Sequence, residues 1–167
     1  MTTLEAFNTA EPPAATELVL HWCAAPDWAS AICAARPYDS LQALQKRSTE
    51  LWADATERDL QLAFAAHPVI GDVELLRSKY ASQANVEQGQ VLTASDTVIA
   101  DLARQNLAYR QRHGFTFIVC ATGKSAEQML ALLNARIHNS TDDELKNAAA
   151  EQLEIMQLRL QQSFSAN

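Results

Sequence analysis

The chain has 167 residues, of which 13 are basic and 20 acidic, giving a formal net charge of −7 at pH 7. That length predicts one domain, and the acidic balance offers no electrostatic source for sequence-independent binding to nucleic acid or to an anionic membrane. Because 48% of the residues are hydrophobic and only 20% charged, the chain can bury a core and does not have the composition of a disordered protein.

Helix-forming residues dominate the composition, with 30 Ala and 20 Leu against 13 Val and Ile together. We therefore expect an all-α protein, a compact single-domain bundle of about seven or eight helices over residues 1–167. The three cysteines form no C-x-x-C pair, which argues against a disulfide framework or a zinc ribbon and favours a reducing, cytoplasmic location. Neither a signal peptide nor an apolar stretch of membrane-spanning length is visible, so no membrane association is expected.

The first half of the chain contains the signals for four helices. The first begins near Pro12–Pro13, a pair suited to an N-terminal turn, and ends at Pro26. The fourth must end at His67, because the residue before a proline avoids helical geometry. The N-caps of the second, third and fourth helices are expected at Asp27, Ser40 and Thr56.

Helical periodicity weakens between residues 69 and 92, where Asp72 is expected only as the N-cap of a short helix. A helix resumes around Ser95 and ends at Gly114, a typical C-terminal glycine. The following run FTFIVC, residues 115–120, resembles a strand but has no second run to pair with. We expect it to be an extended buried segment that offers free backbone N–H groups.

Two capping-box patterns indicate where the last two helices begin. Ser125-x-x-Gln128 opens a helix that runs through Ile137, and Thr141-x-x-Glu144 opens the final helix.

His67 is the first candidate for chemistry, because the carbonyl end of a helix favours a protonated imidazole that could act as a general acid. The alternative is a purely structural role, in which the histidine at the end of the helix donates a hydrogen bond to a free carbonyl. Ser82, Asn85, Glu87 and Gln88 form the densest polar cluster of the weakly periodic region. This cluster is either a solvated loop or a ligand site in which Glu87 faces His67.

Two arginines stand out on helical faces. Arg136 falls inside the apolar arc of its helix, where a guanidinium needs a partner such as a carboxylate. Arg159 lies nearer the edge of its apolar stripe, and exposure to solvent or a structural ion pair is favoured there. No metal-ligand spacing and no nucleotide, serine-hydrolase or zinc-protease motif is visible, and Cys120 is expected to be inert packing.

Eight groups of residues, spread over nearly the whole chain, form a specific combination. They are Phe7-Asn8; Trp22-Cys23 with Trp28; Arg36-Pro37-Tyr38; His67-Pro68-x-Ile70-Gly71-Asp72; Ser82 with Glu87-Gln88; Tyr109-Arg110 through Gly114-Phe115-x-Phe117-Ile118-Val119-Cys120; Ala135-Arg136-Ile137-x-Asn139; and Leu158-Arg159-Leu160. With them the chain resembles the 2-oxo-4-hydroxy-4-carboxy-5-ureidoimidazoline (OHCU) decarboxylases of purine breakdown. Val69, His21 and Ala24 depart from frequent family choices, and none of them removes a proposed catalytic group.

The resemblance implies an all-α, cofactor-free homodimer that binds no metal and takes a small ureidoimidazoline substrate. His67 matches the family's catalytic histidine, and Glu87 matches its partner carboxylate. The substrate-binding candidates are Pro68, Ser82, Ala84, Asn85, Val86, Gln88, Val119, Cys120, Ala121, Thr122, Gly123, Arg136 and Arg159. Which arginine first recognises the charge of the substrate stays open.

The implied chemistry suits these residues, because a ring carbonyl beside the carboxylated carbon can delocalise the charge left by CO₂ without a cofactor. Backbone N–H groups of residues 119–123 would stabilise the enolate, and His67, oriented by Glu87, would protonate one face to give (S)-allantoin. Two other functions remain as alternatives. One is a non-catalytic helical ligand-binding or interaction module, and the other is hydrolysis of a ureide ring with Glu87 as base.

Overall fold

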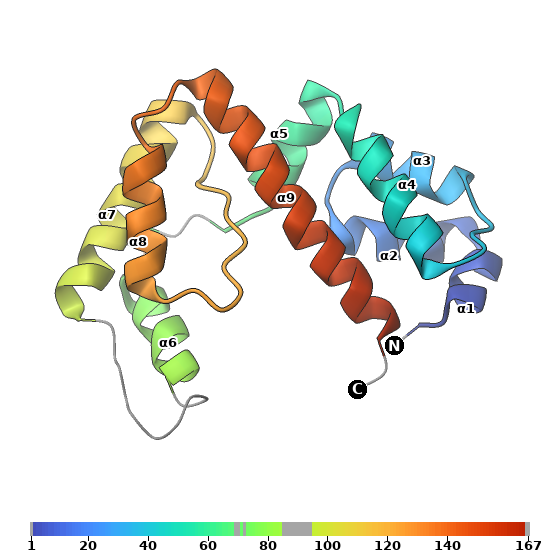
Figure 1. Cartoon of the computed structure of the whole chain (residues 1–167), viewed down its shortest axis with the longest axis horizontal. Helices are drawn as coiled ribbons and strands as arrows, with labels where there is room; N and C mark the ends of the chain where they lie inside the picture. Colours follow the sequence, from blue (N-terminus) through green and yellow to red (C-terminus); the bar gives the residue numbers. More distant parts are fainter. Residues whose placement is uncertain (1, 69–70, 72, 85–94, 166–167) are drawn as a thin grey trace. The chain divides into compact units, whose positions relative to one another are not determined.

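The computed structural model describes residues 2–68, 71, 73–84 and 95–165, with only the backbone for residues 81–84, and all regular structure in this part is helical (Figure 1). The helices of the described residues are α1 (Leu4–Thr9), α2 (Pro12–Trp22), α3 (Pro26–Ala34), α4 (Leu41–Ala53), α5 (Glu57–Ala65), α6 (Val73–Ala84), α7 (Asp96–His113), α8 (Ala126–Arg136) and α9 (Thr141–Phe164). The all-α expectation is confirmed, with one or two helices more than expected. None of these described helices is long and apolar enough to cross a membrane.

The chain divides into two compact units. The first unit consists of residues 1–66 and 149–167, and the second unit is the continuous stretch 67–148. Helix α9 therefore contributes its first eight residues to the second unit and the remainder to the first. A single domain over residues 1–167 stays a prediction.

Most of the expected helix ends are confirmed. A side-chain oxygen accepts a backbone N–H of the first helical turn at the predicted N-caps Ser40, Thr56 and Ser125. Ser95, around which a helix was expected to resume, caps α7 in the same way. Ser125 also forms the full capping box, because the side chain of Gln128 accepts the Ser125 N–H in return. Gly114 ends α7 with a φ of 81°, a left-handed conformation that glycine adopts without steric cost.

Several expectations near prolines are wrong. Pro26 does not end a helix but begins α3, because a fixed φ and a missing N–H suit the first position of a helix. Asp27 consequently lies in the first turn of α3, whose N-cap is Ala25. Helix α5 ends at Ala65, two residues before the predicted His67, and the short helix α1 was not anticipated. The predicted cap Asp72 lies outside the described residues.

Helix α3 is capped by a residue that is distant in the sequence. Its own N-cap has no side chain able to accept a hydrogen bond, but the carboxylate of Asp59 on α5 takes that role. Oδ2 of Asp59 accepts the Trp28 N–H at 2.8 Å and Oδ1 accepts the Asp27 N–H at 3.2 Å, while Asp59 itself is 1% exposed. The negative charge also lies at the positive end of the helix dipole, so it stabilises α3 twice over.

We expect Asp59→Ala to lower the free energy of unfolding by about 2 kcal/mol, because the buried Trp28 N–H and the partly buried Asp27 N–H lose their acceptor. Urea unfolding followed by circular dichroism at 222 nm measures the effect. Asp39→Ala, which removes the same charge at an exposed position, serves as the control. Equal midpoints for the two variants would contradict the capping role.

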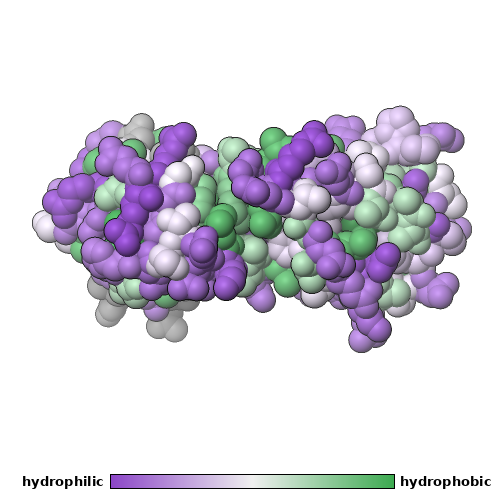
Figure 2. All heavy atoms as spheres, turned by 90° about the horizontal axis from the view of Figure 1, so that it is seen from above, coloured by the Kyte–Doolittle hydropathy of each residue, from purple (hydrophilic) through white to green (hydrophobic). Residues whose placement is uncertain are grey.

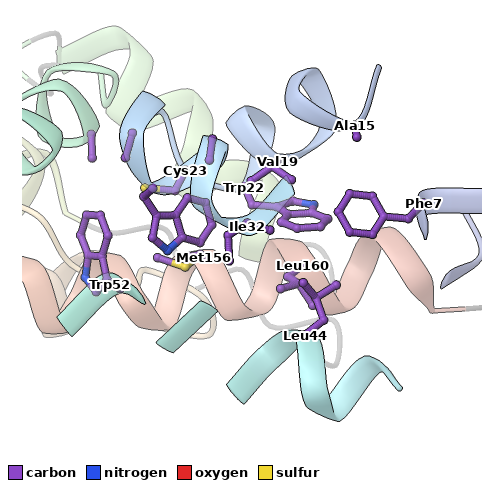
Figure 3. Packing of buried hydrophobic residues seen from close by; sticks show 14 of the residues in the cluster. Phe7, Ala15, Val19, Trp22, Cys23, Ile32, Leu44, Trp52, Met156 and Leu160 are labelled. Carbon is purple, nitrogen blue, oxygen red and sulfur yellow. The ribbon is translucent and has the colours of Figure 1, made fainter. Parts of the chain in front are cut away.

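The core of the first unit gathers side chains from α1 to α5 around the second half of α9 (Figure 3). Met156 and Leu160 of α9 are fully buried in this cluster. The indole Nε1 of Trp22 donates to Ser163 Oγ at 2.8 Å, and that of Trp52 donates to the Ala149 carbonyl at 2.9 Å. The first unit therefore includes a segment that arrives from the far end of the chain.

The core of the second unit is built from α6, α7, α8 and the stretch 115–121. In the stretch, Thr116, Phe117 and Ile118 are buried, and residues 116–120 are neither helix nor strand, which confirms the predicted buried segment. The buried segment is thus held by packing and by side-chain hydrogen bonds rather than by a sheet. On the outside, hydrophilic side chains cover much of the surface seen in Figure 2.

Candidate active site

Arg136, the last residue of α8, binds the buried segment to the rest of the second unit. Its Nε donates to Glu144 Oε1 at 2.9 Å and its Nη1 donates to the Ile118 carbonyl at 2.9 Å. The guanidinium also lies 4.6 Å from the centre of the Phe117 ring, a favourable cation–π distance. The prediction that this arginine needs a carboxylate partner is confirmed. Its Nη2 is buried and has no hydrogen-bond partner in the described part of the chain.

Glu144 is the centre of a polar network in the second unit, and its side chain is 0% exposed. Besides Arg136, its Oε1 accepts the Tyr109 hydroxyl at 2.6 Å. Its Oε2 accepts the side-chain amides of Asn139 at 3.0 Å and Asn147 at 2.7 Å. Four donors therefore meet one buried carboxylate, as a buried charge requires.

This network corrects the predicted capping box at Thr141. Ser140 performs the capping instead, since its Oγ accepts the Asp143 N–H at 3.1 Å. The Thr141 hydroxyl lies 3.0 Å from Nδ1 of His113, and Glu144 points into the core rather than back to the start of its helix. The Thr141-x-x-Glu144 pattern is local, so it could not show that four donors from other positions bind the Glu144 carboxylate.

The ionisation of the network follows from its hydrogen bonds. Burial by itself raises the pKa of Glu144, but the hydrogen bonds from Tyr109, Asn139 and Asn147 and the charge of Arg136 outweigh it, so the pKa is lowered overall. The pKa of Tyr109 is raised far above its usual value, first by burial and then by the Glu144 carboxylate. Tyr109 therefore remains the donor and Glu144 the charged acceptor.

Acid should weaken the protein through Glu144. A carboxyl group whose folded-state pKa is depressed contributes stability that is complete well above its unfolded-state value, here 4.5, and is lost as the pH falls through the folded-state pKa. We expect the free energy of unfolding of the wild type to fall below about pH 4.5 more steeply than that of Glu144→Gln. Urea titrations between pH 3 and 7 measure both slopes, and parallel slopes would refute the assignment.

The stretch 119–123, predicted to bind substrate, follows directly after the carbonyl that Arg136 holds, and it ends in a tight turn. The Lys124 N–H donates to the Ala121 carbonyl at 3.1 Å, and Lys124 Nζ donates to the Cys120 carbonyl at 2.7 Å. Gly123 has a φ of 73°, which a residue with a side chain rarely adopts. Lys124 was missed by the sequence analysis, although a lysine directly after a Thr-Gly turn was a signal that could have been noted.

His67 lies two residues beyond the end of α5 and is half-buried, and Pro68 after it is exposed. Gly71, four residues further on, lies close to α7, because a Cβ built on it would lie only 2.9 Å from Leu107 Cδ2. The close approach gives a physical reason for the glycine in this motif. The histidine thus follows the carbonyl end of α5 by two residues, whereas it was predicted to be the last residue of that helix.

The other candidate site residues have varied placements. Glu87, Asn85, Val86 and Gln88 lie outside the described residues, and only the backbone of Ser82 and Ala84, in α6, is described. Arg159 belongs to the first unit, where its Nη1 donates to the Trp22 carbonyl at 3.3 Å. The contacts therefore join Arg136 to Ile118, directly before the 119–123 stretch, and Arg159 to the last residue of α2.

Comparison with known proteins identifies relatives along most of the chain. The family model described as OHCU decarboxylase matches residues 8–161. The 2-oxo-4-hydroxy-4-carboxy-5-ureidoimidazoline decarboxylase of Haloferax volcanii is 30% identical over 133 residues, which are 78% of this chain and 77% of that protein. The uric acid degradation bifunctional protein TTL of Arabidopsis thaliana is 32% identical over 86% of this chain, which spans only 45% of that protein's length.

Two solved structures share the fold. A crystal structure of OHCU decarboxylase in the presence of (S)-allantoin superposes with a TM-score of 0.74 at 29% identity and covers 90% of this chain and 99% of that one. A crystal structure of (S)-allantoin synthase has the same TM-score at 15% identity, covers 99% of this chain and 54% of that one, and is informative about the fold alone.

Proposed function

The chain belongs to the OHCU decarboxylase family, and from this membership we propose that it converts 2-oxo-4-hydroxy-4-carboxy-5-ureidoimidazoline to (S)-allantoin and CO₂ in the breakdown of urate. The observation that carries the proposal is the family match over residues 8–161. The solved relative in the presence of (S)-allantoin, similar over 90% of the chain, supports the identity of the product.

The reaction needs few groups from the protein. The bond between the hydroxyl-bearing ring carbon and its carboxylate breaks and CO₂ leaves. The electron pair forms a double bond to the neighbouring ring carbon, which carries the ureido group, while the ring imine nitrogen takes up a proton. The product of this step is the enol or enolate of allantoin, with its oxygen on the carbon that lost CO₂. Backbone N–H groups of residues 119–123 stabilise the resulting enolate oxygen. His67, oriented by Glu87, then donates a proton to one face of the ureido-bearing carbon while the enolate oxygen becomes the ring carbonyl, and this fixes the (S) configuration.

The remaining contacts to substrate come from groups around this centre. Side chains and backbone of Pro68, Ser82, Ala84, Asn85, Val86 and Gln88 complete the proposed binding site, which is also poorly solvated where the carboxylate leaves. Arg159 is a candidate for the initial recognition of the carboxylate, because within the described residues its guanidinium makes one hydrogen bond, from Nη1 to the Trp22 carbonyl at 3.3 Å. Arg136, the other candidate, already has its Nε and Nη1 engaged by Glu144 and by the Ile118 carbonyl, so Arg159 is the better candidate for this contact.

We also propose that the protein acts in the cytoplasm as a homodimer. Sedimentation velocity at micromolar concentration tests the oligomeric state, and a single species of monomer mass, 18.4 kDa, would reject the dimer.

The decisive experiment measures decarboxylation of freshly generated OHCU by the wild-type protein, because the substrate also decays spontaneously. The circular dichroism of the product is followed with and without protein. Fast formation of optically active allantoin supports the proposal. A racemic product at the uncatalysed rate would reject it in favour of a ligand-binding module, and ring opening without CO₂ would indicate a hydrolase.

A further inference from the structure

Two cationic side chains donate hydrogen bonds to the carbonyls of two alternate peptide units at the start of the proposed enolate-binding stretch. Arg136 Nη1 donates to the Ile118 carbonyl at 2.9 Å, and Lys124 Nζ donates to the Cys120 carbonyl at 2.7 Å. The two carbonyls are two residues apart, and the cations come from different places, the end of α8 and the residue after the Gly123 turn.

The N–H groups of the same two peptide units belong to Val119 and Ala121. In a planar trans peptide the N–H points opposite to the C=O, so each of these N–H groups points away from the cation that holds its carbonyl. Both peptides are trans, since the one cis peptide bond in the described residues is Arg36–Pro37. Within that part of the chain, neither the Val119 N–H nor the Ala121 N–H donates to any acceptor.

A charged donor on a carbonyl oxygen also changes the N–H of the same peptide. Charge-assisted hydrogen bonds are stronger than neutral ones, and hydrogen bonds in series polarise one another. A peptide whose oxygen is bound by a guanidinium or an ammonium group is therefore a better donor at its nitrogen. The two peptides become a pair of strengthened, vacant donors.

Both cations are themselves held in place. Glu144 fixes Arg136 from a fully buried position, and the Phe117 ring lies against the guanidinium. Lys124 is fixed by the turn in which its own N–H binds the Ala121 carbonyl. Donors that are already oriented lose no free energy to reorganisation when charge develops, which is the condition for effective stabilisation of an oxyanion.

We propose that Arg136 and Lys124 are positioning residues for decarboxylation, which orient and polarise the Ile118–Val119 and Cys120–Ala121 peptides so that their N–H groups stabilise the enolate. The inference rests on the proposed function, and it adds two side chains that act through the backbone without touching the reacting atoms.

Steady-state kinetics of Lys124→Met and Arg136→Lys test the proposal. Each substitution should lower kcat by about tenfold, a fraction of the loss seen when an oxyanion donor is removed outright. KM should stay within about threefold, because the charge develops only in the transition state. The product should remain (S)-allantoin, since His67 is untouched. Matched exposed controls, Lys146→Met and Arg104→Lys, should keep kcat within about twofold.

Proton NMR supplies a readout that does not depend on turnover. The amide proton of Ala121 should move upfield in Lys124→Met, and that of Val119 should move upfield in Arg136→Lys, because each peptide loses polarisation. An unchanged kcat in Lys124→Met, a racemic product from it, or unmoved amide shifts would each overturn the inference. If Arg136→Lys fails to fold, Lys124→Met decides alone. An inactive wild type with the expected amide shifts would instead reject the proposed function.

Discussion

Replacing His67 by alanine is expected to lower the rate of OHCU decarboxylation by about 10²- to 10⁴-fold, the usual contribution of a general acid. The allantoin that still forms should be racemic, because the proposed proton donor to one face is gone. The side chain is half-buried beyond the end of α5, so its removal leaves no large cavity. The loss should therefore appear in activity and not in stability.

Rate and stereochemistry can be measured together by circular dichroism of the product from freshly generated substrate. His21→Ala removes an exposed histidine from the last turn of α2 and should behave as the wild type. A folded His67→Ala variant that still makes optically active allantoin at the wild-type rate would show that the proton comes from another group.

Glu144→Ala should be the most destabilising single substitution in the second unit, at about 3–5 kcal/mol. The substitution leaves the guanidinium of Arg136 without its counter-charge and removes the acceptor of the Tyr109 hydroxyl. Asn139 and Asn147 lose their partner as well. The loss comes chiefly from stranded buried donors rather than from the worth of the ion pair itself.

Urea denaturation measures the effect, with Glu154→Ala, an exposed substitution on the same helix, as the control. The double variant Glu144→Ala/Arg136→Met should recover part of the lost stability, because the unpaired charge is gone. If Glu144→Ala and Glu154→Ala unfold at the same urea concentration, the network has no stabilising role.

The sequence predicted the helical class and most helix ends because these depend on neighbours in the chain. Ser40, Thr56, Ser95 and Ser125 cap helices through contacts that span three residues. Composition favoured helices, and the one strand-like run, residues 115–120, had no second run to pair with. The role of Pro26 was predicted wrongly, because a proline can either end one helix or begin the next and the sequence pattern does not distinguish these two roles.

Residues whose partners are remote in sequence were beyond prediction. Asp59 caps α3 from about 30 residues away, and Glu144 binds Tyr109 from 35 residues away. The ion pair of Arg136 could be predicted, because an arginine in the apolar arc of a helix needs a charged partner, but the sequence did not show which carboxylate that partner is. The pairing of His67 with Glu87 stays a prediction, since it came from the family resemblance and Glu87 lies outside the described residues.

The division of the chain also bears on the order in which the protein folds during synthesis. The second unit is one continuous stretch, so all of it is available once residue 148 has left the ribosome. The first unit has to wait for residues 149–164, which carry Met156 and Leu160 into its core and accept the indole N–H groups of Trp22 and Trp52. Contacts this distant in sequence close slowly. A nascent chain that stalls near residue 148 would expose the aromatic core of its earlier half to chaperones and proteases.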